Sequence, residues 1–156
     1  MIHHISISAH HPLHVAEVLA EILEGTAFPF PPVPGGFVTI SGDMHGTLVE
    51  IYPLTTEMTP GQDGKEVQIV QTAEASAYSA THAALSVTLD ETRIKEIAVR
   101  EGWRALTCDR GGMFQVVEFW IENRILFELL TPEMARTYVN SMKPKKWAKS
   151  IEHGTD

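Results

Sequence analysis

Two histidines and two glutamates recur in this sequence at one fixed spacing. His4 and His82 lie 78 residues apart, and Glu50 and Glu128 are separated by the same 78 residues. Each histidine therefore precedes its glutamate by 46 positions. Neutral imidazole is a good ligand for borderline divalent metals such as zinc, nickel and iron, and carboxylate oxygens add negative charge. The repeated pair indicates a divalent-metal site with two His and two Glu ligands.

The residues around these four positions repeat as well. HISIS, beginning at His4, aligns with HAALS, beginning at His82. GTLVEIY, beginning at Gly46, aligns with RILFELL, beginning at Arg124, at the same offset and without a gap. A repeat of this kind indicates two related modules.

The first half of the chain has the pattern of a strand, a helix and two further strands. Residues 2–9 alternate between apolar and polar side chains, which predicts a half-buried strand. Apolar residues at helical spacing follow Pro12 and stop at Gly25, which predicts a helix. FPFPPVPGG, over 28–36, is too rich in proline for a central strand and indicates a loop or ragged edge. FVTIS and TLVEIY, joined by GDMHG, predict two strands.

The second half repeats this order. HAALSVTL, over 82–89, predicts a strand, and Asp90 is a good N-cap for a helix that ends at Gly102. WRALTCD, MFQVVEFWIE and ILFELL predict three more strands, and a final helix is expected from Pro132. Residues 55–79 predict a connecting segment in which only KEVQIVQT has strand character.

Strand geometry gives the candidate ligands polar neighbours. Because side chains alternate between the two faces of a strand, His4 shares a face with Ser6 and Ser8. Both candidate glutamates interrupt apolar strand segments. A carboxylate in such a segment is costly to bury unless a metal or another ion compensates its charge.

Composition excludes several classes of protein. The formal net charge of -8 argues against nucleic acid as the main partner, and the basic segment KPKKWAK, over 143–149, is expected to be a solvated helix end. The single cysteine, Cys108, excludes an internal disulfide and fits a reducing compartment, where we expect a buried structural thiol. No leader and no membrane-spanning apolar run is evident, so a cytoplasmic protein is expected.

Together these segments resemble the vicinal oxygen chelate superfamily, which includes glyoxalase I, extradiol dioxygenases, and fosfomycin and bleomycin resistance proteins. The resemblance rests on HHISIS, GTLVEIYP, THAALSV and ILFELLTP, and it covers about residues 2–132. It implies an α+β fold in which two βαβββ modules with curved mixed sheets enclose a metal-binding cleft. The expected organisation is module one over about 1–54, a linker over 55–79, module two over about 80–132, and a C-terminal helix and basic tail over 133–156.

The resemblance also implies roles for the repeated residues. The family's ligand positions match His4, Glu50, His82 and Glu128, and a set of two His and two Glu is similar to that of glyoxalase I. The metal would be Zn, Ni, Fe, Mn or Co. The implied function is a lyase or isomerase that moves a proton of a small carbonyl-containing substrate through a metal-stabilised enediolate, with Glu128 or Glu50 as the base. Polar and aromatic residues expected to contact the substrate are Ser6, Ser8, Tyr52, Ser86, Thr88 and Trp120.

Alternatives within the same fold stay open. An extradiol iron dioxygenase would use two His and one Glu and leave Glu50 idle. A non-enzymatic drug-binding or ligand-binding protein would need no metal. Glutathione is not expected as a substrate, because residues 9–24 contain no Arg or Lys. Relatives pair modules within or between chains, and a homodimer is expected.

Other candidate residues have simpler interpretations. Glu118 could support a ligand from the neighbouring strand. His3 is expected to lie at the surface or to serve in packing. His10, His11 and His14 are expected to be exposed, and a role for one of them in supporting a ligand or in a lid stays open.

Overall fold

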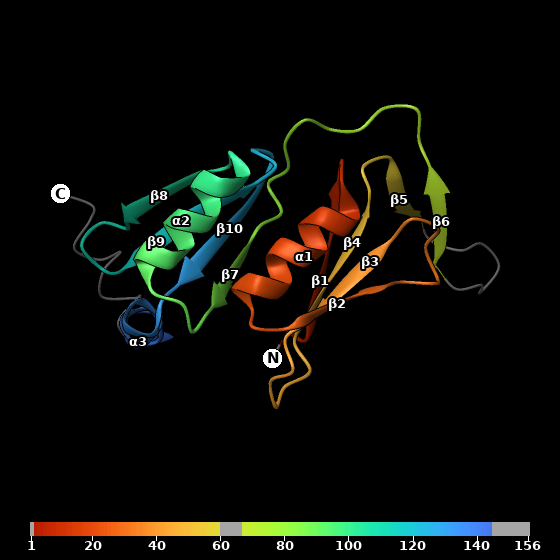
Figure 1. Cartoon of the computed structure of the whole chain (residues 1–156). Helices are drawn as coiled ribbons and strands as arrows, with labels where there is room; N and C mark the ends of the chain where they lie inside the picture. Colours follow the sequence, from red (N-terminus) through yellow and green to blue (C-terminus); the bar gives the residue numbers. More distant parts are fainter. Residues whose placement is uncertain (1, 60–66, 145–156) are drawn as a thin grey trace. The chain divides into compact units, whose positions relative to one another are not determined.

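The computed structural model describes residues 2–59 and 67–144 of the 156-residue chain (Figure 1). The chain divides into two compact units, Met1–Thr81 and His82–Asp156, which are described separately below. The basic tail predicted after the last helix lies outside the described residues from position 145 onward. Among the described residues, no helix has the length and apolar content needed to span a membrane.

The first unit is a four-stranded sheet with one helix. Its elements are β1 (His4–Ala9), α1 (Pro12–Ile22), β2 (Thr26–Pro29), β3 (Phe37–Ile40) and β4 (Leu48–Pro53). The strand order is β1-β4-β3-β2, in which β1 and β4 are parallel and the other neighbours antiparallel. A separate hairpin follows, made of β5 (Thr56–Thr59) and β6 (Gln68–Gln71).

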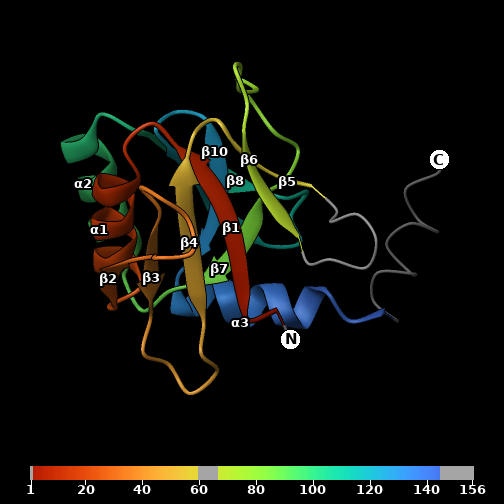
Figure 2. The ribbon, with the colours of Figure 1, turned by 90° about the vertical axis from the view of Figure 1, so that its right-hand side faces the viewer.

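Helix α1 lies along one face of this sheet (Figures 1 and 2). Pro12 stands at the start of the helix, where its missing N–H breaks no helical hydrogen bond. The fully buried Thr39 donates its hydroxyl to the backbone oxygen of Ala16 at 2.7 Å, and so joins β3 to α1. Apolar residues of the helix fill the space against the sheet; they are Val15, Ala16, Val18, Leu19 and Ile22.

The second unit has the same order of elements. It contains β7 (Ala83–Ser86), α2 (Glu91–Glu101), β8 (Arg104–Asp109), β9 (Gln115–Ile121), β10 (Ile125–Leu130) and α3 (Pro132–Ser141). The sheet order β7-β10-β9-β8 matches that of the first unit, again with one parallel pair, β7 and β10. The predicted α+β fold with two βαβββ modules is therefore confirmed.

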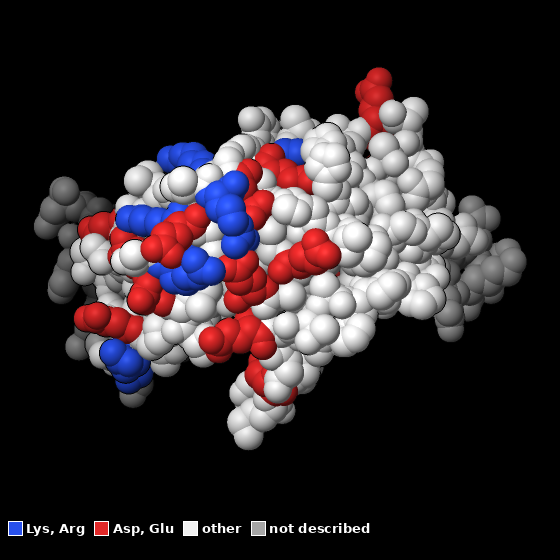
Figure 3. Space-filling model, in the orientation of Figure 1, with Lys and Arg blue, Asp and Glu red and all other residues white. Residues whose placement is uncertain are grey.

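Local signals explain the ends of α2. The Asp90 side chain accepts a hydrogen bond from the backbone N–H of Arg93 at 2.8 Å, as an N-cap does. Gly102 ends the helix in the left-handed conformation, with φ of 68°. The rest of α2 carries interspersed acidic and basic side chains on its outer side (Figure 3), including the pair Lys95–Glu91 at 2.6 Å.

The loop or ragged edge predicted for the proline-rich segment is present, because β2 takes Thr26–Pro29 and pairs with β3 on one side only. Two other strand assignments need correction. The strand expected over 82–89 is too long, since β7 ends at Ser86 and the chain then turns toward the N-cap of α2. Strand β5 is absent from the prediction, because Thr56–Thr59 has little apolar alternation and forms a strand by pairing with β6.

Candidate metal and catalytic site

Glu50 lies on the face of the first sheet that is turned away from α1. It stands opposite Ser6 in the parallel pairing of β1 and β4. Ser6 Oγ donates a hydrogen bond to Glu50 Oε2 at 2.7 Å, and Tyr52 Oη donates to the same oxygen at 2.6 Å. Glu50, the carboxylate predicted within an apolar strand, is therefore held by two neutral hydroxyl groups.

Tyr52 is a buried residue, with 5% of its surface exposed. Its ring stacks on Phe30, with 6.0 Å between ring centroids and 26° between planes. Burial, and then the hydrogen bond to Glu50, raise the pKa of Tyr52 to about 12. The hydroxyl therefore stays protonated at neutral pH and can act as the donor to Glu50.

His4 begins β1 two residues before Ser6, so the alternation of the strand places it on the same face as Glu50. Its side chain is exposed and makes no hydrogen bond to any residue that the structure describes. Ser8 follows on this face, opposite Tyr52. The first unit thus supplies one candidate imidazole and one candidate carboxylate on a single sheet face.

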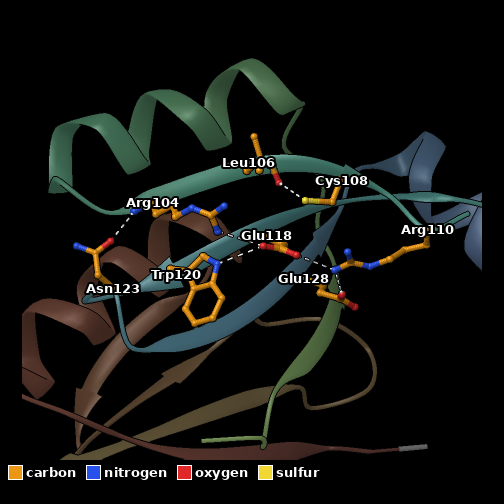
Figure 4. Close-up of polar contacts among 8 residues, drawn as sticks. All are labelled: Arg104, Leu106, Cys108, Arg110, Glu118, Trp120, Asn123 and Glu128. Atoms are coloured by element: carbon orange, nitrogen blue, oxygen red, sulfur yellow. Dashed lines mark hydrogen bonds and ion pairs between the residues drawn. The ribbon is translucent and has the colours of Figure 1, made fainter. Parts of the chain in front are cut away.

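Glu128 has a different partner in the second unit (Figure 4). Arg110 Nη2 contacts Glu128 Oε1 at 2.5 Å and Glu118 Oε1 at 3.0 Å. Glu118 stands directly opposite Glu128 in the antiparallel pairing of β9 and β10. These side chains lie on the side of the sheet away from α2, with 13% of Glu128 and 16% of Glu118 exposed.

Glu118 accepts further contacts through its second oxygen. Arg104 Nη1 lies 3.2 Å from Oε2, and the indole N–H of Trp120 lies 3.4 Å from it (Figure 4). Burial alone would raise the pKa of Glu118, but the hydrogen bonds from Arg110, Trp120 and other donors outweigh it and lower this pKa. Burial, and then the negative charge of Glu118, raise the pKa of the Cys108 thiol. Cys108 is a free cysteine that is half-buried, whereas the sequence predicts a buried structural thiol.

The other candidates of the second unit occupy its first strand and the residues on either side of it. His82 is exposed and immediately precedes β7. Ser86 is the last residue of β7 and Thr88 lies beyond it, both exposed.

Comparison with known proteins identifies the fold. No protein-family model and no curated protein sequence matches the chain. Solved structures do match: the fosfomycin resistance protein FosX from Listeria monocytogenes is 14% identical, with 83% of this chain and 90% of that chain covered at a TM-score of 0.52. FosX from Mesorhizobium loti is 15% identical, with coverage of 88% and 96% and a TM-score of 0.52. The chain has the vicinal oxygen chelate fold. A variant of the Listeria FosX with Mn(II) and 1S,2S-dihydroxypropylphosphonic acid also matches, at 14% identity, coverage of 83% and 87% and a TM-score of 0.53.

Within this vicinal oxygen chelate fold, each unit by itself holds two of the four predicted ligands. Among residues 2–59 and 67–144, no group of three or more His, Cys, Asp or Glu side chains is arranged to hold a metal ion. A hollow of about 670 Å³ does occur in the second unit, between the first turns of α2 and α3 and the turn after β8. It is lined by residues such as Asp90, Met113 and Arg136 and includes none of the predicted site residues.

Arg110 is the residue that sequence reasoning missed. It belongs to the turn RGG, which has no pattern of its own. A signal was nevertheless present, because the hairpin turn at Asn123 makes Glu118 and Glu128 facing residues. Two carboxylates at facing positions repel each other and require a cation.

Proposed function

We propose that this protein is a metal-dependent lyase or isomerase of the glyoxalase type, which acts on a small carbonyl-containing substrate by proton transfer through an enediolate. The proposed metal ligands are His4, Glu50, His82 and Glu128. The observation that carries the proposal is the repeated His–Glu pair, in which each glutamate is anchored through one oxygen, Glu50 on the sheet face away from α1 and Glu128 on the sheet face away from α2.

The donor set fits a divalent metal. Two imidazoles and two carboxylates suit Zn, Ni, Fe, Mn or Co, and the two negative charges balance a divalent cation. Within the described part of the chain, Oε1 of Glu50 and Oε2 of Glu128 accept no hydrogen bond, so each carboxylate has one oxygen available. A bound metal would supply a Lewis acid that polarises the substrate carbonyl.

The contacts of the two glutamates favour different roles. Glu128 is held through Oε1 by the positively charged guanidinium of Arg110, a fixed ionic contact that suits a ligand. Glu50 is held by the neutral hydroxyls of Ser6 and Tyr52 rather than by an ionic contact with a described residue. We therefore propose both residues as metal ligands in the substrate-free protein, and Glu50 as the base, which would use the same Oε1 once bound substrate releases it from the metal.

The substrate would contact the polar and aromatic residues on the same faces. Ser8 and Trp120 are half-buried, and Ser86 and Thr88 are exposed. Hydroxyl and indole groups can orient a small polar molecule by hydrogen bonds and stacking.

Metal binding is the first test. Protein purified without a tag should contain, or take up in calorimetry, about one divalent ion per set of four ligands, and Glu128→Ala should abolish uptake. Glu57→Gln and His3→Ala are matched controls, because both residues are exposed in the first unit and neither belongs to the ligand set. Protein that binds no divalent ion, or binds it equally after Glu128→Ala, contradicts the proposal.

Proton transfer is the second test. In D₂O, the metal-loaded protein should catalyse exchange of the proton next to the carbonyl in a panel of α-hydroxycarbonyl compounds and thiol adducts, followed by NMR. Glu50→Gln should lose exchange by a factor of 100 or more, within the range for removal of a general base, while still folding. Oxygen consumption with catechols and Fe²⁺ that survives Glu50→Gln would instead support a dioxygenase, and tight ligand binding unaffected by EDTA would support a binding protein.

A second candidate follows from the solved structures. The FosX structure with Mn(II) and a dihydroxypropylphosphonic acid makes a phosphonate the alternative substrate class. Incubation with fosfomycin and Mn²⁺, followed by ³¹P NMR, tests it: a new phosphonate signal that requires Glu128 favours this candidate, and an unchanged spectrum excludes fosfomycin.

We also propose that the protein is a homodimer. If ligands from two copies complete each site, refolding His4→Ala and His82→Ala chains together restores metal binding to about a quarter of the sites, because each mixed dimer retains one intact set. Pairing within one chain leaves the mixture without binding. Sedimentation of the wild-type protein as a monomer would contradict the dimer.

A further inference from the structure

The proline-rich segment is folded back on itself next to the proposed site. After β2, the backbone N–H of Phe30 donates to the oxygen of Gly36 at 2.9 Å, and that of Gly36 donates to Val33 at 2.8 Å. Val33 is 1% exposed and anchors the segment in the unit. The loop is therefore a compact element with a buried anchor, and Phe30 is at its first hydrogen-bonded position.

A continuous set of contacts leads from this loop to Glu50. Phe30 stacks on Tyr52 at 6.0 Å, which fixes the plane of the Tyr52 ring. The ring carries the hydroxyl that donates to Glu50 Oε2 at 2.6 Å. A phenylalanine at position 52 could bury nearly the same ring, so the fold alone does not require the hydroxyl.

The corresponding positions of the second unit show that these hydroxyls are specific to Glu50. At the 78-residue offset, Leu130 corresponds to Tyr52 and Ala84 corresponds to Ser6. Neither can donate a side-chain hydrogen bond, and Glu128 is held by Arg110 instead. The repeat thus conserves the carboxylate while its support differs, as expected when the support tunes what each carboxylate does.

We propose that Tyr52, supported by Phe30, is a positioning residue that occupies Oε2 of Glu50 and so leaves Oε1 as the oxygen that binds the metal. This inference rests on the proposed function, because it assumes that Glu50 is a ligand. Ser6 donates to the same oxygen, so Oε2 carries two hydrogen bonds and the carboxylate is limited to one free oxygen.

The test uses Mn²⁺ and Co²⁺ alone, without a substrate. Tyr52→Phe should weaken Mn²⁺ binding in calorimetry by about 10- to 100-fold, the usual effect of removing a hydrogen bond to a metal ligand. It should also change the visible absorption bands of bound Co²⁺, which report the ligand geometry. Phe30→Leu should shift both readouts in the same direction by a smaller amount, and Phe30→Tyr, which keeps the ring, should leave them as in the wild type.

Controls separate positioning from general stability. Tyr78→Phe is the matched control, because Tyr78 is 68% exposed. The Tyr78→Phe protein should bind Mn²⁺ and Co²⁺ as the wild type does. Ser6→Ala combined with Tyr52→Phe should weaken binding by a factor different from the product of the single effects, because both donors share one oxygen. Wild-type affinity and an unchanged Co²⁺ spectrum in Tyr52→Phe overturn this inference but leave the proposed function intact. Absence of His82-dependent metal binding in the wild type overturns both.

Discussion

Glu118 of β9 and Glu128 of β10 face each other directly and share one guanidinium group, that of Arg110. Both carboxylates are largely buried, and Arg110 is 32% exposed. Arg110 is therefore shared by the two facing carboxylates, and the exposed Arg104 adds a second ionic contact to Glu118 through its other oxygen.

Arg110→Gln should destabilise the protein by about 1–3 kcal/mol at neutral pH, because it leaves two carboxylates facing each other without their shared cation. Urea denaturation measures the free energy of unfolding. Arg104→Gln is the matched control, and it should cost under about 1 kcal/mol because Arg104 is 53% exposed. Equal losses of unfolding free energy in the two variants would show that the Arg110 contacts with Glu118 and Glu128 stabilise the protein no more than a surface ion pair does.

The difference in unfolding free energy between the wild type and Arg110→Gln should also become smaller at acidic pH. The pKa of Glu118 is lowered in the folded protein, so its contribution is present above the unfolded-state pKa and disappears as the pH falls through the folded-state pKa. The wild type should therefore lose more stability than Arg110→Gln between pH 6 and pH 3, roughly the range in which carboxyl groups titrate. A difference in unfolding free energy between the wild type and Arg110→Gln that stays constant from pH 6 to pH 3 would contradict this explanation.

The raised pKa of Tyr52 predicts that the free energy of unfolding falls at alkaline pH. Its pKa is raised from 10.0 to about 12 in the folded protein, so its contribution is complete below pH 10 and is lost as the pH rises toward 12. The wild type should lose about 1–2 kcal/mol more than Tyr52→Phe over this range. Denaturation at pH 9, 10 and 11 measures the difference, and parallel losses in both proteins would refute it.

A side chain at position 25, between α1 and β2, is expected to clash with the end of β3. A Cβ atom at this position would lie 2.2 Å from the backbone oxygen of Ile40. Gly25→Ala should therefore destabilise the first unit by about 2 kcal/mol or more, since backbone must move to make room. Gly42→Ala is the comparison: it has open space but φ of +70°, and should cost about 1 kcal/mol. A smaller effect at Gly25 than at Gly42 would mean that the strand yields easily.

Metal removal should change thermal stability if the proposed site exists. A ligand that binds only the folded state at 100 times its Kd stabilises it by about 2.7 kcal/mol, so Mn²⁺ should raise Tm and EDTA should reverse the rise. His82→Ala should abolish the shift, whereas His3→Ala should keep it. A rise in Tm that persists in His82→Ala would place the binding elsewhere.

Much of the fold follows from local signals. The interval between His4 and His82 predicted two modules, and the structure has the same sheet order in both units. Pro12, Asp90 and Gly102 marked helix ends correctly, because their effects depend on their own backbone and adjacent N–H groups.

The sequence predicts a loop or ragged edge over 28–36, and β2 forms at the edge of the sheet because only one side of an edge strand needs a hydrogen-bonding partner. The strand that the sequence did not predict depends on its partner strand. Strand β5 depends on pairing with β6, which no local pattern in Thr56–Thr59 reveals.

The sequence by itself determined the repeated modules and the two carboxylates on apolar strands, because periodicity and composition are properties of the chain. Only the tertiary structure decided how those carboxylates are held. Hydroxyls of Ser6 and Tyr52 reach Glu50, and the guanidinium of Arg110 reaches Glu128 from 18 residues away. Such contacts depend on strand register and on the path of loops, which bring distant side chains to one sheet face.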